Sequence, residues 1–341
     1  MNTRRLPSAD RVLVTGARGS AAAGVMRAIG GEHATILAAD VDPYAPGLYL
    51  VPPEYRLLVP RADDPAFADE LLATCRAHGV SIVIPGEAAE LAPLAARAED
   101  FAVAGIRLMV ASSDALAVAG DRIAVRERIA GELPSVPTTL LDAGRVPADH
   151  PWPARVRPRS LAGDAEAVTV AGRQELDALP TDGRLVLEPV MDGQETWIDV
   201  LRIDGRCIAT VPRECLRRDA GIAVTTRTRR DDALQRAAAE AAAALALEGI
   251  ATVHVQRDRA GRTFLADVAA GVPDEIALPV AAGVNMPALW LRSALGRGGV
   301  SPVQDFDEIA MARVPREQTV PVSELGVTGR STGEIVGDIA A

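Results

Sequence analysis

Arginines occupy alternate positions in one short stretch of the sequence, at Arg155, Arg157 and Arg159. Alternate residues of a strand point to the same face, so a strand here would present its guanidinium groups together, beside the loop that follows. Each guanidinium can hold two phosphate oxygens through paired hydrogen bonds. Solvated arginines on an edge strand would produce the same spacing. Considered alone, the stretch leaves both interpretations open. The rest of the sequence favours phosphate contact.

A second pair of residues suits a divalent cation. Gln256 and Asp267 fall in two strand-like runs, 252–257 and 263–268, which a turn through 259–261 would join as a hairpin. If the two side chains face each other across that hairpin, they offer oxygen ligands to Mg²⁺, which takes few protein oxygens and completes its shell with phosphate and water. Exposed polar residues on an ordinary hairpin are the alternative, and without further context they are the simpler interpretation.

Glycines cluster after the first apolar run of the chain. They are Gly16, Gly19 and Gly24. With Asp40 at the end of the next apolar run, they resemble a dinucleotide site, in which glycines admit a pyrophosphate to a helix N-terminus and an acid binds a ribose hydroxyl. The spacing is imperfect, and a tight turn needs glycine for its geometry alone. Glu87 and Glu90 can likewise face a ligand crevice or simply favour the start of a helix.

Elements that position these residues follow from the apolar pattern. Up to about residue 112, apolar runs at 11–14, 35–39, 56–59, 81–85 and 105–110 alternate with helical stretches. This alternation is typical of a doubly wound α/β domain with a parallel sheet. A helix is expected from Ser113 to about Gly131, and the two prolines between 134 and 137 indicate a boundary.

The pattern in the remainder of the chain predicts an α+β fold. Residues 154–188 alternate strand-like runs with a glycine-containing loop and a short helix, which predicts a small lobe. Beyond Glu195, two strands joined at Asp204-Gly205, a helix over 231–248 and the hairpin predict a larger lobe. The residues after 300 are expected to form a tail that packs on this core. The predicted domains are 1–112, 113–190, 191–300 and 301–341.

Composition narrows the class of partner. The 341 residues are 48% hydrophobic and 24% charged, as in an ordinary soluble globular protein, and the net charge of −10 argues against nucleic acid. Three cysteines at irregular spacing fit buried reduced thiols. No apolar run is long enough for a bilayer, and the first residues lack a signal-peptide core. We expect a cytoplasmic protein with no membrane partner; its oligomeric state is open, a homodimer included.

In this order, the segments resemble the ATP-grasp superfamily, specifically the ATP-binding unit of the carbamoyl-phosphate synthetase large chain and stand-alone carboxylate–amine ligases. The resemblance covers about residues 11 to 296. Its main segments are Val12-Leu13-Val14-Thr15-Gly16-Ala17, Asp40-Val41-Asp42-Pro43, Asp121-Arg122, Arg157-Pro158, Leu187-Glu188-Pro189-Val190, Gly193-Gln194-Glu195, Val211-Pro212-Arg213 and Ala281-Ala282-Gly283-Val284-Asn285-Met286-Pro287. It implies a Rossmann-like pre-ATP-grasp domain followed by a two-lobed ATP-grasp fold, with ATP and Mg²⁺ as cofactors.

The resemblance also implies roles for single residues. The implied phosphate contacts are Arg122, Arg157 and Arg159. The implied nucleoside contacts, at the hinge between the lobes and at the ribose, are Glu188, Val190 and Glu195. Gln256 and Asp267 fall on two metal-ligand positions. Arg213 would hold the substrate carboxylate, so that Arg157 and Arg213 are the implied catalytic residues.

Some positions depart from the family pattern. Relatives carry an asparagine that binds magnesium two residues after the second metal ligand, and an arginine near the reacting phosphate four residues after it; here these are Ala269 and Gly271. The glycine-rich loop over the phosphates is reduced to Leu161-Ala162-Gly163-Asp164-Ala165-Glu166, whose two acids would repel phosphate. Catalytic competence therefore needs a direct test.

Three functions remain to be distinguished. The favoured hypothesis is an ATP-dependent ligase that joins a small-molecule carboxylate to an amine through an acyl phosphate. A degenerate relative that binds nucleotide or substrate without ligation is the second hypothesis, favoured by Ala269 and Gly271. An NAD(P)-dependent oxidoreductase that uses the glycine turn is the weakest, because the rest of the chain offers it no catalytic pair.

Overall fold

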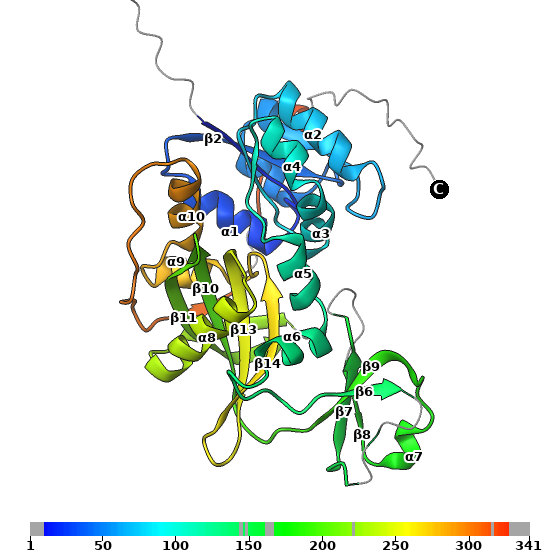
Figure 1. Ribbon diagram of the computed structural model, residues 1–341. Helices are drawn as coiled ribbons and strands as arrows, with labels where there is room; N and C mark the ends of the chain where they lie inside the picture. The colour runs from blue at the N-terminus through cyan, green and yellow to red at the C-terminus, as the bar shows by residue number, and fades with distance from the viewer. Residues whose placement is uncertain are drawn as a thin grey trace, which may run out of the picture.

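The computed structural model describes residues 10–142, 146, 149–160, 167–219, 222–314 and 317–326. Its named strands form three sheets: a five-stranded sheet near the N-terminus, a four-stranded sheet in the middle of the chain, and a six-stranded sheet after it (Figure 1). Within the described ranges, no helix has both the length and the apolar character that crossing a membrane requires.

The first sheet is parallel throughout and has the order β3-β2-β1-β4-β5. Its strands are β1 (Asp10–Val14), β2 (Ala34–Asp40), β3 (Arg56–Leu58), β4 (Ile82–Ile84) and β5 (Arg107–Leu108). Its helices are α1 (Ser20–Ile29), α2 (Phe67–Ala77), α3 (Ala88–Ala96) and α4 (Ala98–Val103), with short 3₁₀ turns at Pro46–Leu50 and Pro53–Tyr55. Alternate residues of β1 pack on opposite faces, Val12 toward α1 and Leu13 toward α2. The predicted doubly wound domain is confirmed.

Two helices, and not the single one predicted from Ser113 to Gly131, lead out of this domain. They are α5 (Ser113–Ala119) and α6 (Arg122–Ile129). The break is at Asp121, whose carboxylate accepts hydrogen bonds from the backbone N–H groups of Ile123 and Ala124 and so caps α6. The single-helix prediction was wrong because the apolar pattern continues through a capping residue. The cap places Arg122 at the first position of α6.

The small lobe is an antiparallel sheet of order β6-β9-β7-β8. It contains β6 (Thr139–Asp142), β7 (Ala154–Pro158), β8 (Val168–Val170), a short helix α7 (Arg173–Leu176) and β9 (Asp182–Pro189). Its core is small and apolar, built around Leu141, Val156 and Leu187. The loop 161–166, which the family resemblance placed over phosphate, lies outside the described residues.

The large sheet has the order β14-β13-β10-β11-β12-β15. It is formed by β10 (Glu195–Ile203), β11 (Arg206–Asp219), β12 (Ile222–Thr228), β13 (Gly249–Arg257), β14 (Thr263–Ala270) and β15 (Ala310–Ala312), with α8 (Asp232–Ala244), α9 (Ala277–Ala281) and α10 (Met286–Ala294). The predicted turn at Asp204-Gly205 is present: both residues have positive φ, 50° and 75°, as a tight hairpin of this type requires.

The last helix of this region returns to the first domain. In Figure 1, α10 lies beside α1, far from the strands that precede it in the small lobe. Its Leu291 is fully buried in the same core as Val12, Val25 and Ile29. Part of the first domain's core therefore comes from a segment that is distant in sequence.

The segments after α10 also contact both parts of the molecule. Val303 pairs with Ala209 of β11, and β15 extends the large sheet beyond β12. A 3₁₀ turn at Val322–Glu324 lies against the first domain, where the Arg56 guanidinium donates to the carbonyl of Glu324 at 2.6 Å. The described part of the tail thus packs on the rest of the chain.

Candidate active site

A pocket of about 90 Å³ lies between the small lobe and the large sheet. The strands β7 and β9 supply one wall, and β10, β13 and β14 supply the other. The lining residues are Val136, Arg155, Arg157, Glu188, Pro189, Val190, Met191, Glu195, His254, Gln256, Ala266 and Asp267. Six of the residues predicted from the sequence, Arg157, Glu188, Val190, Glu195, Gln256 and Asp267, are therefore brought to one place.

Arg157 bridges the two walls of the pocket. Its Nη1 donates to Glu188 Oε2 at 3.2 Å within the small lobe, and its Nη2 donates to Asp267 Oδ2 of β14 at 2.5 Å. Burial acts to lower the pKa of this guanidinium, but the adjacent Asp267 and Glu188 raise it overall. Arg157 is thus a permanent cation that ties the small lobe to the large one.

Arg122 reaches the same carboxylate from α6. Its Nη2 donates to Asp267 Oδ2 at 2.9 Å, and its Nη1 donates to the carbonyl of Pro158. Burial lowers the pKa of Arg122, with Asp267 acting against that shift. The Nε of Arg122 is buried and has no hydrogen-bond partner in the described part of the chain. Such an unpartnered buried donor is rare in folded proteins and calls for an explanation.

Arg159 lies just outside this pocket, at the junction of β7 and α6. Its guanidinium pairs with the capping residue Asp121 at 2.8 Å, and its side chain is 40% exposed. The ion pair raises the pKa of Arg159. Arg159 is therefore placed beside the end of the strand where the predicted phosphate loop begins, and not among the lining residues described above.

The charges of the pocket interior are balanced without a ligand. Arg122 and Arg157 both contact Asp267, and Arg157 also contacts Glu188. Glu188 accepts a further hydrogen bond from the Thr138 hydroxyl at 3.2 Å. Both carboxylates are buried, so their partners screen them in place of water. An anion that binds here must replace the carboxylates as the partner of the arginines. A cation must replace the arginines as the partner of the carboxylates.

The predicted metal pair does not meet directly across the hairpin. In the β13–β14 ladder, Gln256 lies opposite Phe264 and Asp267 lies opposite His254, because the register shifts between His254 and Val255. The expectation that Gln256 faces Asp267 is corrected to this extent, although both line the pocket. Their side chains offer a carboxylate and an amide oxygen, which are donors that suit Mg²⁺. No group of three or more His, Cys, Asp or Glu able to hold a metal occurs among the described residues.

The residues predicted to contact the nucleoside lie at the connection between the lobes. The Val190 N–H donates to the carbonyl of Pro153 at 3.4 Å, and the Met191 carbonyl accepts from Gln256 Nε2 at 3.3 Å. Glu195 is opposite Gln256 in the β10–β13 ladder and lies 3.8 Å from Arg218. Glu195 is exposed, so its carboxylate is accessible at the pocket mouth.

Sequence reasoning missed His254, which lines this pocket, and Thr138, whose hydroxyl contacts the lining residue Glu188. His254 is two positions before Gln256 on the same strand, so strand alternation alone would have placed it on the same face. Burial lowers the pKa of His254 to about 4, and it is therefore a neutral side chain in the pocket wall. Thr138 gave no comparable signal, because its contact with Glu188 crosses fifty positions of sequence.

Arg213 lies elsewhere, outside the described residues that line the pocket. It is buried on β11, where Nε donates to Asp199 Oδ2 at 2.8 Å and Nη1 is 3.1 Å from Glu275 Oε2. Its guanidinium also lies over the Trp197 ring, 5.3 Å from the centroid. Asp199 is fully buried and accepts a further hydrogen bond from the Thr252 hydroxyl. The nearby residues Ala220 and Gly221, which belong to the predicted substrate-side loop, are not among those described.

In the glycine turn of the first domain, groups that a dinucleotide would contact already have hydrogen-bond partners. The Ala21 N–H, in the first turn of α1, donates to Asp274 Oδ1 at 3.2 Å. Asp40 accepts the N–H of Arg18 with one oxygen and the N–H of Asp42 with the other. A pyrophosphate at this helix would meet the Asp274 carboxylate, and a ribose hydroxyl would have to share Asp40 with two backbone N–H groups. This geometry argues against the oxidoreductase hypothesis.

Comparison with known proteins agrees with this architecture. Residues 181–317 match the family described as ATP-grasp in the biosynthetic pathway with Ter operon, and residues 12–109 match the PylC-like N-terminal domain family. A search of curated protein sequences found no match to this chain.

Several solved structures share the fold at low sequence identity. Biotin carboxylase from Campylobacter jejuni is 15% identical with a TM-score of 0.70, over 85% of this chain and 72% of that one. The L-amino acid ligase from Bacillus licheniformis is 15% identical with a TM-score of 0.65, over 86% and 78%. Pyruvate carboxylase from Rhizobium etli is 17% identical with a TM-score of 0.69; the match covers 87% of this chain but only 30% of that much longer one.

The molecule therefore has the fold of the ATP-grasp enzymes, with a small and a large lobe behind a Rossmann-like domain. The family matches refine this statement: the chain carries an ATP-grasp domain preceded by a PylC-like N-terminal domain. The family and the fold predicted from the sequence are confirmed.

Proposed function

We propose that this protein is an ATP-dependent ligase that joins a small-molecule carboxylate to an amine. The carboxylate oxygen attacks the γ-phosphorus of ATP, the bond to ADP breaks, and the resulting acyl phosphate loses inorganic phosphate when the amine attacks its carbonyl carbon. The main support is one observation: Arg122 and Arg157 converge on Asp267, a buried carboxylate that lines the pocket between the two lobes. Solved relatives that contain MgADP or are named as amino acid ligases add to this support.

The charged residues of the site have different roles in this proposal. In this proposal Arg122 and Arg157 exchange Asp267 for phosphate oxygens, and the unpartnered Nε of Arg122 supplies a further donor. Asp267 and Gln256 are then free to ligate Mg²⁺, which neutralises phosphate charge when it is bound. Arg159 acts from the pocket edge on the outer phosphate. Glu188, Val190 and Glu195 hold the nucleoside.

Arg213 has a different role in this proposal from the one that the resemblance implies. Its guanidinium is already paired with Asp199 and Glu275 and is buried, so a substrate carboxylate would have to displace both acids. We therefore propose that Arg213 positions β10, β11 and the segment around Glu275, and that substrate contact lies elsewhere.

We place this reaction in the cytoplasm. Cys75, Cys207 and Cys215 are all free thiols, as in proteins of a reducing compartment. Burial raises the pKa of the Cys75 thiol to about 12, so this residue is inert. Whether the chain forms a homodimer is a question for light scattering at several protein concentrations.

A second candidate function is nucleotide binding without ligation. It is favoured by Ala269, which leaves Asp267 and Gln256 as the protein oxygens of the predicted metal site. A water can take the vacant place, since Mg²⁺ normally keeps several. The two candidates differ in turnover, not in ATP binding.

The decisive experiment measures binding and turnover together. Calorimetric titration with ATP, with and without Mg²⁺, should give saturable binding that the metal strengthens. A screen of carboxylate and amine pairs should then release ADP, and added hydroxylamine should trap the acyl phosphate as a hydroxamate. ATP binding without ADP release across the whole screen would support the non-catalytic candidate, and absence of ATP binding would contradict both.

Arg157→Ala should weaken ATP by at least tenfold while leaving adenosine nearly unchanged, because the guanidinium contacts phosphate and not the base. Arg157→Lys should recover only part of the loss, since a point charge replaces a planar fork. Arg184→Ala on the adjacent strand β9, where the side chain is 80% exposed and pairs with Asp182, is the matched control. Equal losses for ATP and adenosine would indicate a misfolded lobe instead of a phosphate contact.

A further inference from the structure

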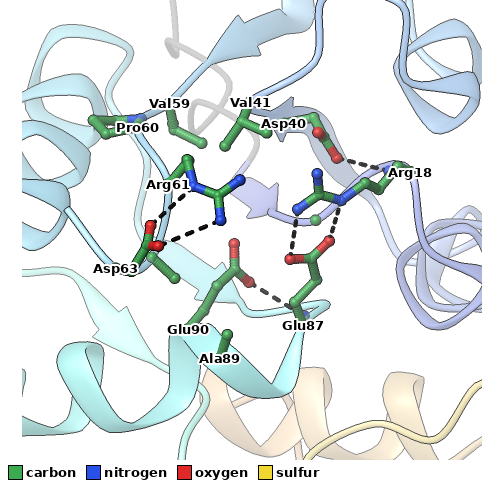
Figure 2. A pocket seen from close by; sticks show the side chains of 12 residues that line it. Arg18, Asp40, Val41, Val59, Pro60, Arg61, Asp63, Glu87, Ala89 and Glu90 are labelled. Atoms are coloured by element: carbon green, nitrogen blue, oxygen red, sulfur yellow. Dashed lines mark hydrogen bonds and ion pairs between the residues drawn. The ribbon is translucent and has the colours of Figure 1, made fainter. Parts of the chain in front are cut away.

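A second pocket lies in the first domain, at the carboxyl ends of the parallel strands (Figure 2). Its volume is about 150 Å³. In doubly wound sheets, ligands bind at this edge. The lining residues are Gly16, Arg18, Asp40, Val41, Val59, Pro60, Arg61, Ala62, Asp63, Glu87, Ala89 and Glu90. The residues proposed to hold ATP and magnesium do not line this pocket.

Glu90 supplies a buried acceptor that faces this pocket. Its side chain belongs to the first turn of α3, and the residue is only 4% exposed. Oε2 accepts from the Thr15 hydroxyl at 2.6 Å and from the Glu87 N–H at 3.2 Å. Figure 2 shows the other oxygen directed into the pocket, with no interaction to the residues drawn. Burial raises the pKa of Glu90 to about 7, which is the expected result when a carboxylate lacks a cation.

Two arginines face Glu90 from the opposite side. Arg18 binds Glu87 through Nε at 2.6 Å and Nη2 at 2.9 Å, and Arg61 binds Asp63 through Nε at 3.0 Å and Nη2 at 3.3 Å. The Nη1 group of each makes no hydrogen bond to the other residues that Figure 2 draws, and both guanidinium groups are turned toward the pocket. Each arginine therefore keeps donors for an acceptor inside the pocket while its own carboxylate partner holds it in place.

The charge of the pocket restricts the ligand further. Four carboxyl groups and two guanidinium groups line it, so the pocket is acidic on balance. The carboxylates would repel a simple anion, and a simple cation would make no use of the two arginine donors. A small molecule that carries an ammonium group and a carboxylate satisfies both sides.

We propose that this pocket binds the head group of an α-amino acid, with the ammonium group donating to Glu90 and the carboxylate accepting from Arg18 and Arg61. In taking this amino acid as one of the two substrates, the inference rests on the proposed ligase function. The chain runs from one pocket toward the other: Asp267 lies on β14, which ends at Ala270, and the next residue, Gly271, packs against Leu91 of α3, beside Glu90. The rest of the amino acid would then extend from the first domain toward the lobe that holds ATP.

The test uses the full chain without ATP, so that it does not depend on turnover. The twenty standard L-amino acids are titrated by calorimetry, and the amino acid that binds best is compared with its decarboxylated and its deaminated analogue. Saturable binding is expected for at least one amino acid, with both analogues at least tenfold weaker. No measurable binding for any of the twenty up to millimolar concentration would overturn the proposal.

Two variants locate the site. Glu90→Gln keeps the hydrogen-bond acceptor for Thr15 but removes the charge, and Arg61→Ala alters a side chain that is 71% exposed; each should weaken the amino acid at least tenfold. Arg97→Ala, which removes another partly exposed arginine of the same domain, is the control and should bind like the wild type. Wild-type affinity in both test variants would place the amino acid elsewhere. If these variants lose amino acid binding but the protein never releases ADP, the pocket stands and the ligase function fails.

Discussion

Replacing Arg213 with alanine is expected to lower the free energy of unfolding by about 3–5 kcal/mol, the cost of removing one partner from a buried ion pair. Asp199 is fully buried, and Arg213 is its cationic partner in the described structure. Without the guanidinium, the Asp199 carboxylate keeps the hydrogen bond from the Thr252 hydroxyl as its side-chain contact among the described residues. Denaturation by urea, followed by circular dichroism, measures the change.

The matched control for this prediction is Arg173→Ala. Arg173 forms an ion pair with Asp177 in which both side chains are more than half exposed, so its loss should change stability by less than about 1 kcal/mol. If Arg213→Ala is as stable as the wild type but no longer binds a carboxylate substrate, the direct substrate role implied by the family resemblance is restored. Loss of either role would abolish activity. The two roles are therefore distinguished by the stability of the variant and not by its activity.

Glu90→Gln is expected to stabilise the protein at pH 8, by about 3 kcal/mol at most given 1.36 kcal/mol for each unit of pKa shift. The folded-state pKa of Glu90 is about 7, raised by burial from an ordinary value of 4.5. The protonated form is therefore favoured by folding, and this contribution is complete below about pH 4.5 and is lost as the pH rises through about 7. Glutamine does not ionise, so the variant does not lose this stability as the pH rises.

The measurement is the free energy of unfolding of wild type and Glu90→Gln between pH 4.5 and 8. The difference between them should grow with pH, with most of the change between about pH 5 and 7. A constant difference across that range would show that Glu90 is ionised throughout and would remove the unpaired acceptor from the second pocket. A gain in stability together with weaker amino acid binding is the usual exchange at a ligand site.

Local signals in the sequence were sufficient for much of the fold. Alternating apolar runs predicted the parallel sheet, and Asp204-Gly205 predicted the hairpin between β10 and β11, because both depend on residues close together in sequence. The helix predicted from Ser113 to Gly131 failed for a local reason as well. Asp121 satisfies the N-terminus of α6, and a cap of this kind interrupts a helix without interrupting its apolar pattern.

The candidate site was predictable in its residues but not in its pairings. Strand alternation and the family pattern together indicated Arg157, Glu188 and Asp267. The finding that Arg157 reaches Asp267 joins positions 110 residues apart on different sheets, which no local pattern specifies. The burial of Arg213 depends in the same way on Glu275, which approaches from another element. Pairings between lobes depend on how the lobes pack together, and local sequence patterns do not specify that packing.

The position of Leu291 in the first core has a consequence for synthesis on the ribosome. The first domain's strands and helices are complete near residue 110, but one fully buried side chain of its core belongs to α10. At about 5–20 residues per second, the roughly 180 intervening residues take about 10–35 s to emerge. During that interval the nascent first domain carries an uncovered apolar face beside α1. We expect chaperones to bind the nascent chain in this interval, and release to follow the emergence of α10.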